Sequence, residues 1–117
     1  MKIGAEDLAK YMMMHMNDGV YNGVRIMSAK SAQLMRQPIA DEEGYGLAMR
    51  ESSDLIPGEL MKGHTGSANG LYSSIFFEPK KKFGFVVITT GCAPQADIDI
   101  RVVLRKSMAI LYEHIIR

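Results

Sequence analysis

The first sixteen residues of the chain carry apolar side chains at helical spacing. Leu8, Met12 and Met16 follow one another at intervals of four, which places them on one face of an α-helix. Acidic residues fall in the first turn of this segment, and Gly19 stands just beyond its end, where helices commonly stop. The pattern predicts a helix from Ala5 to about Met16.

A second, shorter helix is expected after a loop over residues 17–25. Ser28 is a favourable N-cap, because its side-chain oxygen can accept a hydrogen bond from a backbone N–H of the first turn. The helix should run through Met35, and Pro38 then ends it. Residues 1–40 are therefore expected to form a helical segment.

The pattern changes to alternation after residue 40. Residues 45–50 alternate apolar with small or polar side chains, which is typical of a half-buried strand. A turn at Pro57 and Gly58 precedes a second expected strand over residues 59–64. Residues 65–70 are so rich in glycine, serine and asparagine that we expect a loop there.

The strongest strand signal lies in residues 71–90. Two runs of aromatic and β-branched residues, 71–77 and 83–90, flank the charged segment Glu78-Pro79-Lys80-Lys81-Lys82. This arrangement predicts a β-hairpin whose charged tip is solvated.

The chain should end in a helix that is capped by Asp97. An apolar stripe at helical spacing runs toward the C-terminus and consists of Ile100, Val103, Leu104, Met108, Leu111 and Ile115. Helices on either side of a group of strands predict an α+β fold, in which an antiparallel sheet of three to four strands is flanked by helices. We expect residues 1–117 to be a single domain, with the sheet and the last helix in residues 41–117.

Composition and charge exclude several classes of protein. Apolar residues make up 47% and charged residues 23% of the chain, which fits a folded globular protein. The formal charge of +1 gives no basic surface for nucleic acid or an anionic membrane. Charges interrupt the apolar stretch near the C-terminus, and the N-terminal residues lack the apolar region of a secretion signal. We therefore expect no nucleic-acid or membrane partner, and the localisation stays open.

Methionine, histidine and cysteine have structural explanations here. The chain has ten methionines, several of them crowded on the first predicted helix, where core packing or contact with another domain is favoured over a ligand surface. His15 and His114 lack a second ligand at metal-binding spacing, so no metal is assigned. Cys92 has no cationic neighbour in the sequence and is expected to be an inert thiol.

Gly63-His64-Thr65-Gly66, with Ser67 next to it, is the segment most suited to chemistry. Small side chains let a ligand lie close to the backbone, so groups near Ser67 could pair with an amide or hold an oxyanion. His64 could donate a hydrogen bond to a carboxylate. The same residues would equally suit an ordinary tight connection.

Several short motifs, taken in order, resemble the serine β-lactamase-like or penicillin-binding-protein-like family over nearly the whole chain. Gly63-His64-Thr65-Gly66 is similar to the Lys/His-Thr/Ser-Gly motif of that family, and Tyr45-Gly46-Leu47 to its Tyr-Gly-Leu-Gly strand. Other matching segments are Asp7-Leu8-Ala9-Lys10, Asn69-Gly70-Leu71 and Phe83-Gly84-Phe85-Val86-Val87-Ile88-Thr89. The resemblance implies a truncated β-lactamase or transpeptidase-like fold.

The resemblance also implies a substrate site formed by His64, Thr65, Gly66 and Ser67. In the family, the first side chains of the motif steady the substrate carboxylate, and the backbone just beyond the glycine helps to form the oxyanion hole. The chemistry would be that of a class C β-lactamase, esterase or DD-peptidase, which implies no cofactor. The family nucleophile is a serine three residues before a lysine, and no serine of this chain stands there. No catalytic residue is therefore assigned, and a C-terminal fragment of such an enzyme is expected to be inactive alone.

A second class of function stays open, in which a stand-alone binding or oligomerisation module holds a peptide or a subunit at its sheet edge. In the family fold the strand that matches Phe83–Thr90 is central, and one of its neighbours comes from the N-terminal part of the enzyme. That neighbour has no counterpart in this sequence, so we expect an exposed edge and a homo-oligomer, in the form of a two-fold dimer. A peptide or a β-lactam-like molecule is the expected ligand.

Overall fold

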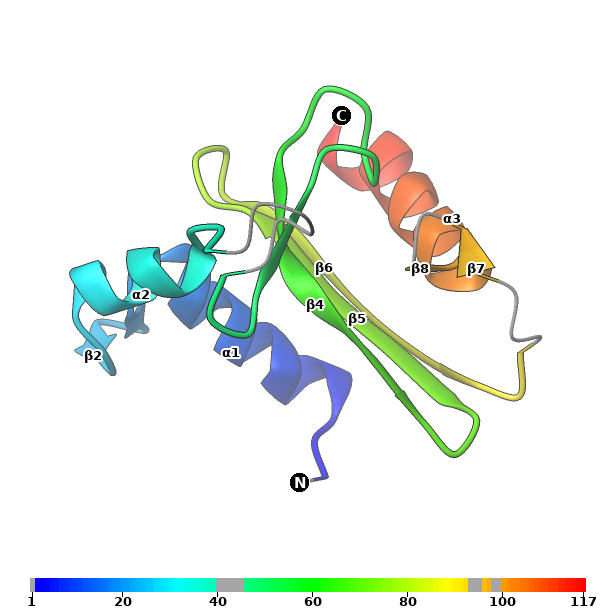
Figure 1. Cartoon of the computed structure of the whole chain (residues 1–117), viewed down its shortest axis with the longest axis horizontal. Coiled ribbons are helices and arrows are strands. Elements are labelled where there is room, and N and C mark those ends of the chain that lie inside the picture. The colour runs from blue at the N-terminus through cyan, green and yellow to red at the C-terminus, as the bar shows by residue number, and fades with distance from the viewer. Residues whose placement is uncertain (1, 40–45, 93–95, 98–99) are drawn as a thin grey trace.

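Figure 1 shows a computed structural model of the chain, which describes residues 2–39, 46–92, 96–97 and 100–117. One antiparallel sheet has the strand order β3-β4-β5-β6 and consists of β3 (Arg50–Ser52), β4 (Met61–Ala68), β5 (Leu71–Glu78) and β6 (Phe83–Thr90). Helices α1 (Ala5–Met16) and α3 (Val102–Leu111) pack on opposite faces of β5 and β6. The expected α+β class, with an antiparallel sheet flanked by helices, is confirmed.

The three long strands form a meander with tight connections. Asn69 and Gly70 join β4 to β5, and their φ angles of 50° and 78° are typical of a two-residue type I′ turn. β5 and β6 pair along their full length, from Leu71 opposite Thr90 to Glu78 opposite Phe83. The hairpin predicted for residues 71–90 is confirmed.

The alternation of side chains along β5 divides the core into two layers. Phe76 and Phe77 are adjacent in sequence, each is 0% exposed, and they point to opposite faces of the sheet. Phe76 lies on the α3 side in a cluster with Leu55, Ile56, Met61, Tyr72, Phe83, Phe85, Ile100, Leu104 and Met108. Phe77 lies on the α1 side in a cluster with Met12, Met16 and Met49. The crowded methionines of the first helix thus belong to the core.

The strand expected over residues 45–50 is wrong for residues 46–49, and Tyr45 lies outside the described residues. Residues 46–49 form a turn instead, in which the Gly46 N–H donates to the Met49 carbonyl at 2.6 Å. Ala48 has a φ of 63°, which a strand does not allow. The strand β3 begins only at Arg50, because the positive φ of Ala48 interrupts the extended backbone ahead of it.

The last helix begins later than expected. Asp97 lies in the short strand β7 (Ala96–Asp97), which pairs with β8 (Ile100–Arg101), so Asp97 is not the helix N-cap. The helix α3 starts at Val102 and continues into the π-helical turn η1 (Tyr112–Ile116). The apolar stripe is buried in its first part at Ile100, Leu104 and Met108, whereas Ile115 is 71% exposed.

The loop expected over residues 17–25 contains a second small hairpin. Strands β1 (Val20–Tyr21) and β2 (Val24–Arg25) flank Asn22 and Gly23, whose φ angles are 51° and 80°. Asn-Gly is a typical sequence for a type I′ turn. The hairpin was not predicted because each flanking strand has only 2 residues, too few to show alternation. Helix α2 (Ala29–Arg36) follows as predicted, and the Ser28 side chain accepts a hydrogen bond of 3.0 Å from the Ser31 N–H.

Two cationic side chains hold the C-terminal end of α1. Arg36 from α2 donates to the His15 carbonyl and also to Asp18 Oδ1 at 2.6 Å. Lys82 from the β5–β6 turn donates to the Met16 carbonyl at 2.6 Å. Cations are favourable there because the last carbonyls of a helix lack intrahelical partners and carry partial negative charge. The contacts join α2 and the β5–β6 turn to α1.

His15 is fully buried, and neither ring nitrogen has a hydrogen-bond partner among the described residues. Burial, helped by the nearby Arg36 charge, lowers the pKa of His15 below its ordinary value of 6.5. The unfolded chain therefore takes up a proton at a higher pH than the folded chain does. The stability that depends on neutral His15 is complete above about pH 6.5 and is lost as the pH falls from there toward the lower pKa of the folded state.

We expect the free energy of unfolding to decrease as the pH falls below about 6.5 toward the lower pKa of the folded state, with a slope of up to about 1.4 kcal/mol per pH unit. Urea unfolding at a series of pH values measures this slope. In the variant His15→Leu the slope should be largely absent over that range. An equal slope in the variant and the wild type would show that another group is responsible.

Candidate functional site

Strand β4 extends well beyond its neighbour β3. β3 pairs only with the start of β4, where Ser52 is opposite Met61 and Arg50 is opposite Gly63. From His64 to Ala68, β4 pairs with β5 on one side. Within the part of the chain that the structure describes, no strand pairs with the other side of this stretch. All four residues of the predicted site thus lie along one strand edge, beyond the end of β3.

The loop expected over residues 65–70 is therefore wrong for residues 65–68, because cross-strand pairing with β5 outweighs the weak strand propensity of glycine and serine. Strand alternation places His64 and Gly66 on the α1 face, and Thr65 and Ser67 on the α3 face. Thr65 is half-buried and the other three are exposed. The four residues share a backbone edge, while their side chains point to two faces.

Two glycines of β4, Gly63 and Gly66, stand where a Cβ atom would come too close to the neighbouring strand β5. A Cβ atom on Gly63 would lie 1.9 Å from the Ile75 carbonyl oxygen, which belongs to backbone that cannot move aside easily. A Cβ atom on Gly66 would lie 2.6 Å from Ser73 Oγ, the end of a side chain that can rotate. Gly63 is therefore required for the close pairing of β4 with β5, whereas a side chain at Gly66 would need only a rotation of Ser73.

A partly buried cation lies on the α1 side of the site. Lys62 precedes His64 by two positions, so both belong to the same face, and Lys62 forms a cross-strand ion pair with Glu51. Burial lowers the pKa of Lys62, and the positive charges of Arg36 and Lys80 lower it further. Sequence reasoning missed Lys62, although its spacing from His64 within a strand was visible.

Another cation lies on the α3 side. Tyr72 on β5 is directly opposite Ser67, and the guanidinium carbon of Arg101 lies 4.5 Å from the centroid of the Tyr72 ring. This distance is typical of a cation–π contact. Arg101 therefore brings positive charge to the face that Thr65 and Ser67 share. The sequence did not indicate this role, because the residues of β8, which carries Arg101, were expected to be helical.

A hollow of about 350 Å³ adjoins the α1 side of the same hairpin, with walls formed by Lys2, Ile3, Leu8, Leu71, Ser73 and Ile88. Leu71 and Ser73 are opposite Ala68 and Gly66 in the β4–β5 pairing.

In the described ranges, histidine, cysteine and acidic side chains form no group of three that could bind a metal ion. No helix in those ranges is both long and apolar enough to span a membrane.

Comparison with known proteins gives one informative similarity. The chain is 33% identical over 100 residues to penicillin-binding protein 4 of Amycolatopsis lactamdurans, an alignment that covers 76% of this chain and 25% of that protein. The chain thus spans about a quarter of the length of this relative. No family model matches the chain, and no solved structure matches it. The similarity indicates a relationship to penicillin-binding and β-lactamase-like proteins.

Proposed function

We propose that this chain corresponds to the C-terminal part of a penicillin-binding-protein-like serine acyl hydrolase, and that the edge of β4 from His64 to Ser67 is its substrate-binding strand. The observation that carries this proposal is the extension of β4 past β3. Among the described residues no strand pairs with the outer side of residues 65–68, whose side chains are small, so an extended ligand could pair there. The similarity to penicillin-binding protein 4 supports the relationship to penicillin-binding proteins on which this proposal rests.

The chemistry of this edge suits an amide-containing carboxylic acid. An amide of the ligand can pair with the backbone of residues 64–68 as an added strand would. The Thr65 hydroxyl can donate to a carboxylate, and the charge of Arg101 favours an anion on the same face. The Ser67 N–H is the proposed donor to an oxyanion. β-Lactams and cell-wall peptides both contain the required groups.

The chain lacks a serine three residues before a lysine, so it carries no activated nucleophile of the family type. Substrate-binding and oxyanion groups alone cannot form the acyl-enzyme bond. We therefore expect no turnover of a chromogenic β-lactam or a short-chain ester, and no acyl adduct in the intact mass after incubation with a β-lactam. Turnover that survives repurification, together with a serine labelled by an acylating probe, would overturn this expectation.

The second candidate function is a binding or oligomerisation module, and the observation that favours it is that no strand of the described residues pairs with the outer side of β6. Gene sequence discriminates the two proposals. A Ser-x-x-Lys motif in frame ahead of Met1 supports the enzyme fragment, whereas a ribosome-binding site immediately ahead of Met1 supports the module.

A further inference from the structure

The buried His15 lies in the contact between α1 and α2, outside both apolar clusters of the sheet. Met12 and Met16 of α1 belong to the cluster on the α1 side of the sheet, whereas His15 is 0% exposed and belongs to neither cluster. Arg36 reaches from α2 to the His15 carbonyl. Ala32 lies one turn before Arg36 on α2 and is also 0% exposed, so this face of α2 is the buried one.

The charged and titratable groups around His15 come from several elements. They are Tyr11 of α1, Asp18 of the following turn, Arg25 of β2, Arg36 of α2 and Lys82 of the β5–β6 turn. Asp18 is the one acid of this set, and its Oδ1 already accepts a hydrogen bond of 2.6 Å from Arg36. Neither ring nitrogen of His15 has a hydrogen-bond partner in the described part of the chain. A protonated His15 is therefore a buried cation close to a second cation.

Asp18 stays ionised over the pH range in which His15 titrates. Burial alone would raise the pKa of Asp18, but the hydrogen bond and the positive charge of Arg36 outweigh burial and lower this pKa below its ordinary value of 3.8. The ion pair between Asp18 and Arg36 is therefore unchanged between about pH 7 and about pH 5. His15 is the group in this contact whose charge changes over that range.

We propose that protonation of His15 opens the contact between α1 and α2, so that acid releases α2 before the sheet unfolds. Two positive charges in one buried contact repel each other, and the Arg36 guanidinium can move away because it ends a long side chain on a separate helix. Its bonds to the His15 carbonyl and to Asp18 then break, and water reaches the imidazolium. Met12 and Met16 keep α1 on the sheet. This release does not depend on whether the edge of β4 binds a ligand.

The end of α2 is in close contact with the residues that lead into β3. A Cβ atom on Gly46 would lie 2.5 Å from the carbonyl oxygens of both Met35 and Gln37, so Gly46 packs directly on the backbone at the end of α2. The turn that begins at Gly46 closes at Met49, and β3 follows it. The first residue of β3 is opposite Gly63, beside the candidate site. Movement of α2 should therefore also loosen the start of β3.

Hydrogen exchange of the 117-residue chain from about pH 7.5 to about pH 5.5, corrected for the intrinsic pH dependence of exchange, tests the proposal. The closed contact lowers the pKa of His15 below 6.5, so closure is most stable above that pH and weakens below it. The protection of α2 amides should fall by up to about tenfold for each pH unit below about 6.5, and β3 should follow. The amides of α3 and β5 should keep their protection. Unchanged protection of α2, or an equal loss in all elements, would overturn the proposal.

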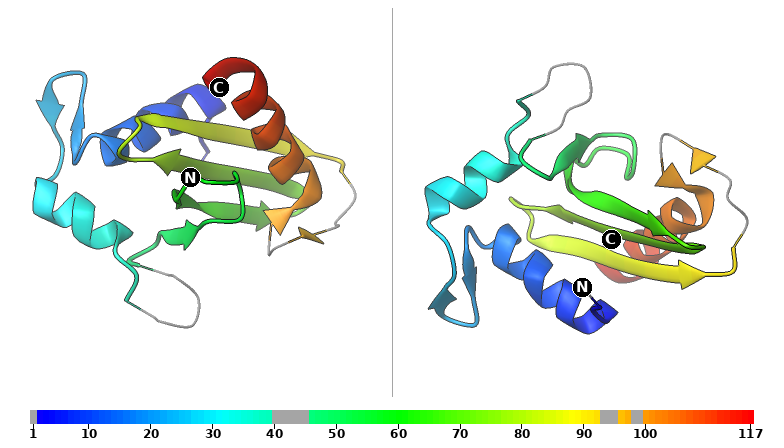
Figure 2. Two further views of the ribbon diagram at one scale, coloured as in Figure 1. Left: turned by 90° about the horizontal axis from the view of Figure 1, so that it is seen from above. Right: turned by 60° about the horizontal axis from the view of Figure 1, so that its bottom comes forward.

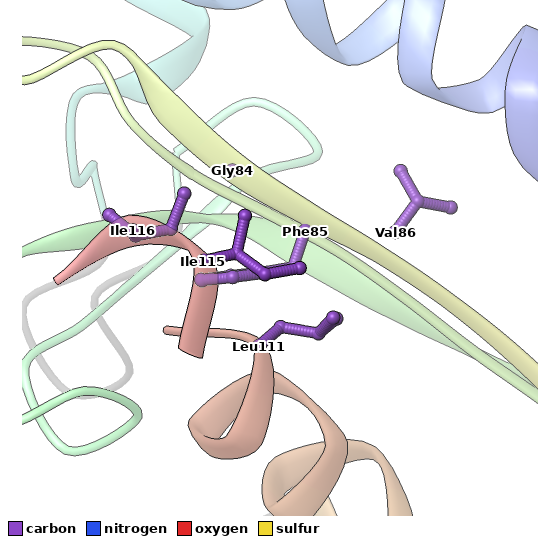
Figure 3. Close-up of a pocket in the computed structure, with 6 residues that line it drawn as sticks. All are labelled: Gly84, Phe85, Val86, Leu111, Ile115 and Ile116. Atoms are coloured by element: carbon purple, nitrogen blue, oxygen red, sulfur yellow. The ribbon is translucent and has the colours of Figure 1, made fainter. Parts of the chain in front are cut away.

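Two histidine variants assign the effect to His15. In His15→Leu the protection of α2 should no longer depend on pH over this range. The same replacement at His114 is the matched control, because His114 is exposed in η1, where Leu111, Ile115 and Ile116 line an apolar groove beside β6 (Figure 3). The α2 response of His114→Leu should equal that of the wild type. A pH-dependent α2 in His15→Leu would contradict the assignment.

A measurement on the wild type needs no variant to fold. The midpoint of the loss of α2 protection should coincide with the titration of the His15 ring signals in nuclear magnetic resonance spectra, because one proton causes both changes. A midpoint that differs from the His15 titration would show that another group opens α2.

Discussion

Replacing Phe76 or Phe77 with alanine should lower the free energy of unfolding by about 3–5 kcal/mol in each case. Both side chains are 0% exposed, and each is a central member of a different cluster, Phe76 on the α3 side and Phe77 on the α1 side. Each replacement removes apolar area and leaves a cavity that the surrounding structure fills only in part. Since a domain of this size is stable by only about 5–15 kcal/mol, either variant should be close to unfolding.

The two variants should differ in which helix opens first. Phe77→Ala should speed amide exchange mainly in α1, and Phe76→Ala mainly in α3, because each loses the packing of one layer. Urea unfolding followed by native-state exchange measures both effects. Leu47→Ala is the control, since Leu47 is 49% exposed and should change the stability by less than about 0.5 kcal/mol. Identical exchange patterns in the two phenylalanine variants would contradict a core divided by the sheet.

The parts of the fold with strong local signals could be predicted from the sequence. The hairpin over residues 71–90 has long apolar strands and a charged turn, and Ser28 caps α2 as expected. Figure 2 shows that α1 and the C-terminal helix lie on opposite sides of the sheet. The failures occur where tertiary pairing decides. Residues 65–68 have weak strand propensity, yet they join β4 because β5 lies beside them.

The candidate site was only partly visible in the sequence. The glycine-rich motif drew attention to these residues, but the exposed edge exists because β3 begins only at Arg50, which is opposite Gly63, and nothing local in residues 63–67 reveals that. Arg101 contacts Tyr72 from the short strand β8, whose sequence looked like the start of a helix. Long-range contacts of this kind depend on the topology of the fold and produce no periodic pattern of residues in the sequence.

An amide-resolved nuclear magnetic resonance titration of the chain with a β-lactam decides whether the edge of β4 binds the ligand. Chemical shifts should change mainly in residues 64–68, with the amides of β6 as the internal control. Thr65→Val should weaken binding about tenfold or more, as expected when a hydrogen bond to a charged group is lost. Thr89→Val is the matched control, because Thr89 is equally half-buried and lies on the same face. Shifts confined to β6, no shifts at all, or equal effects of the two threonine variants would contradict the assignment of this edge as the substrate-binding strand.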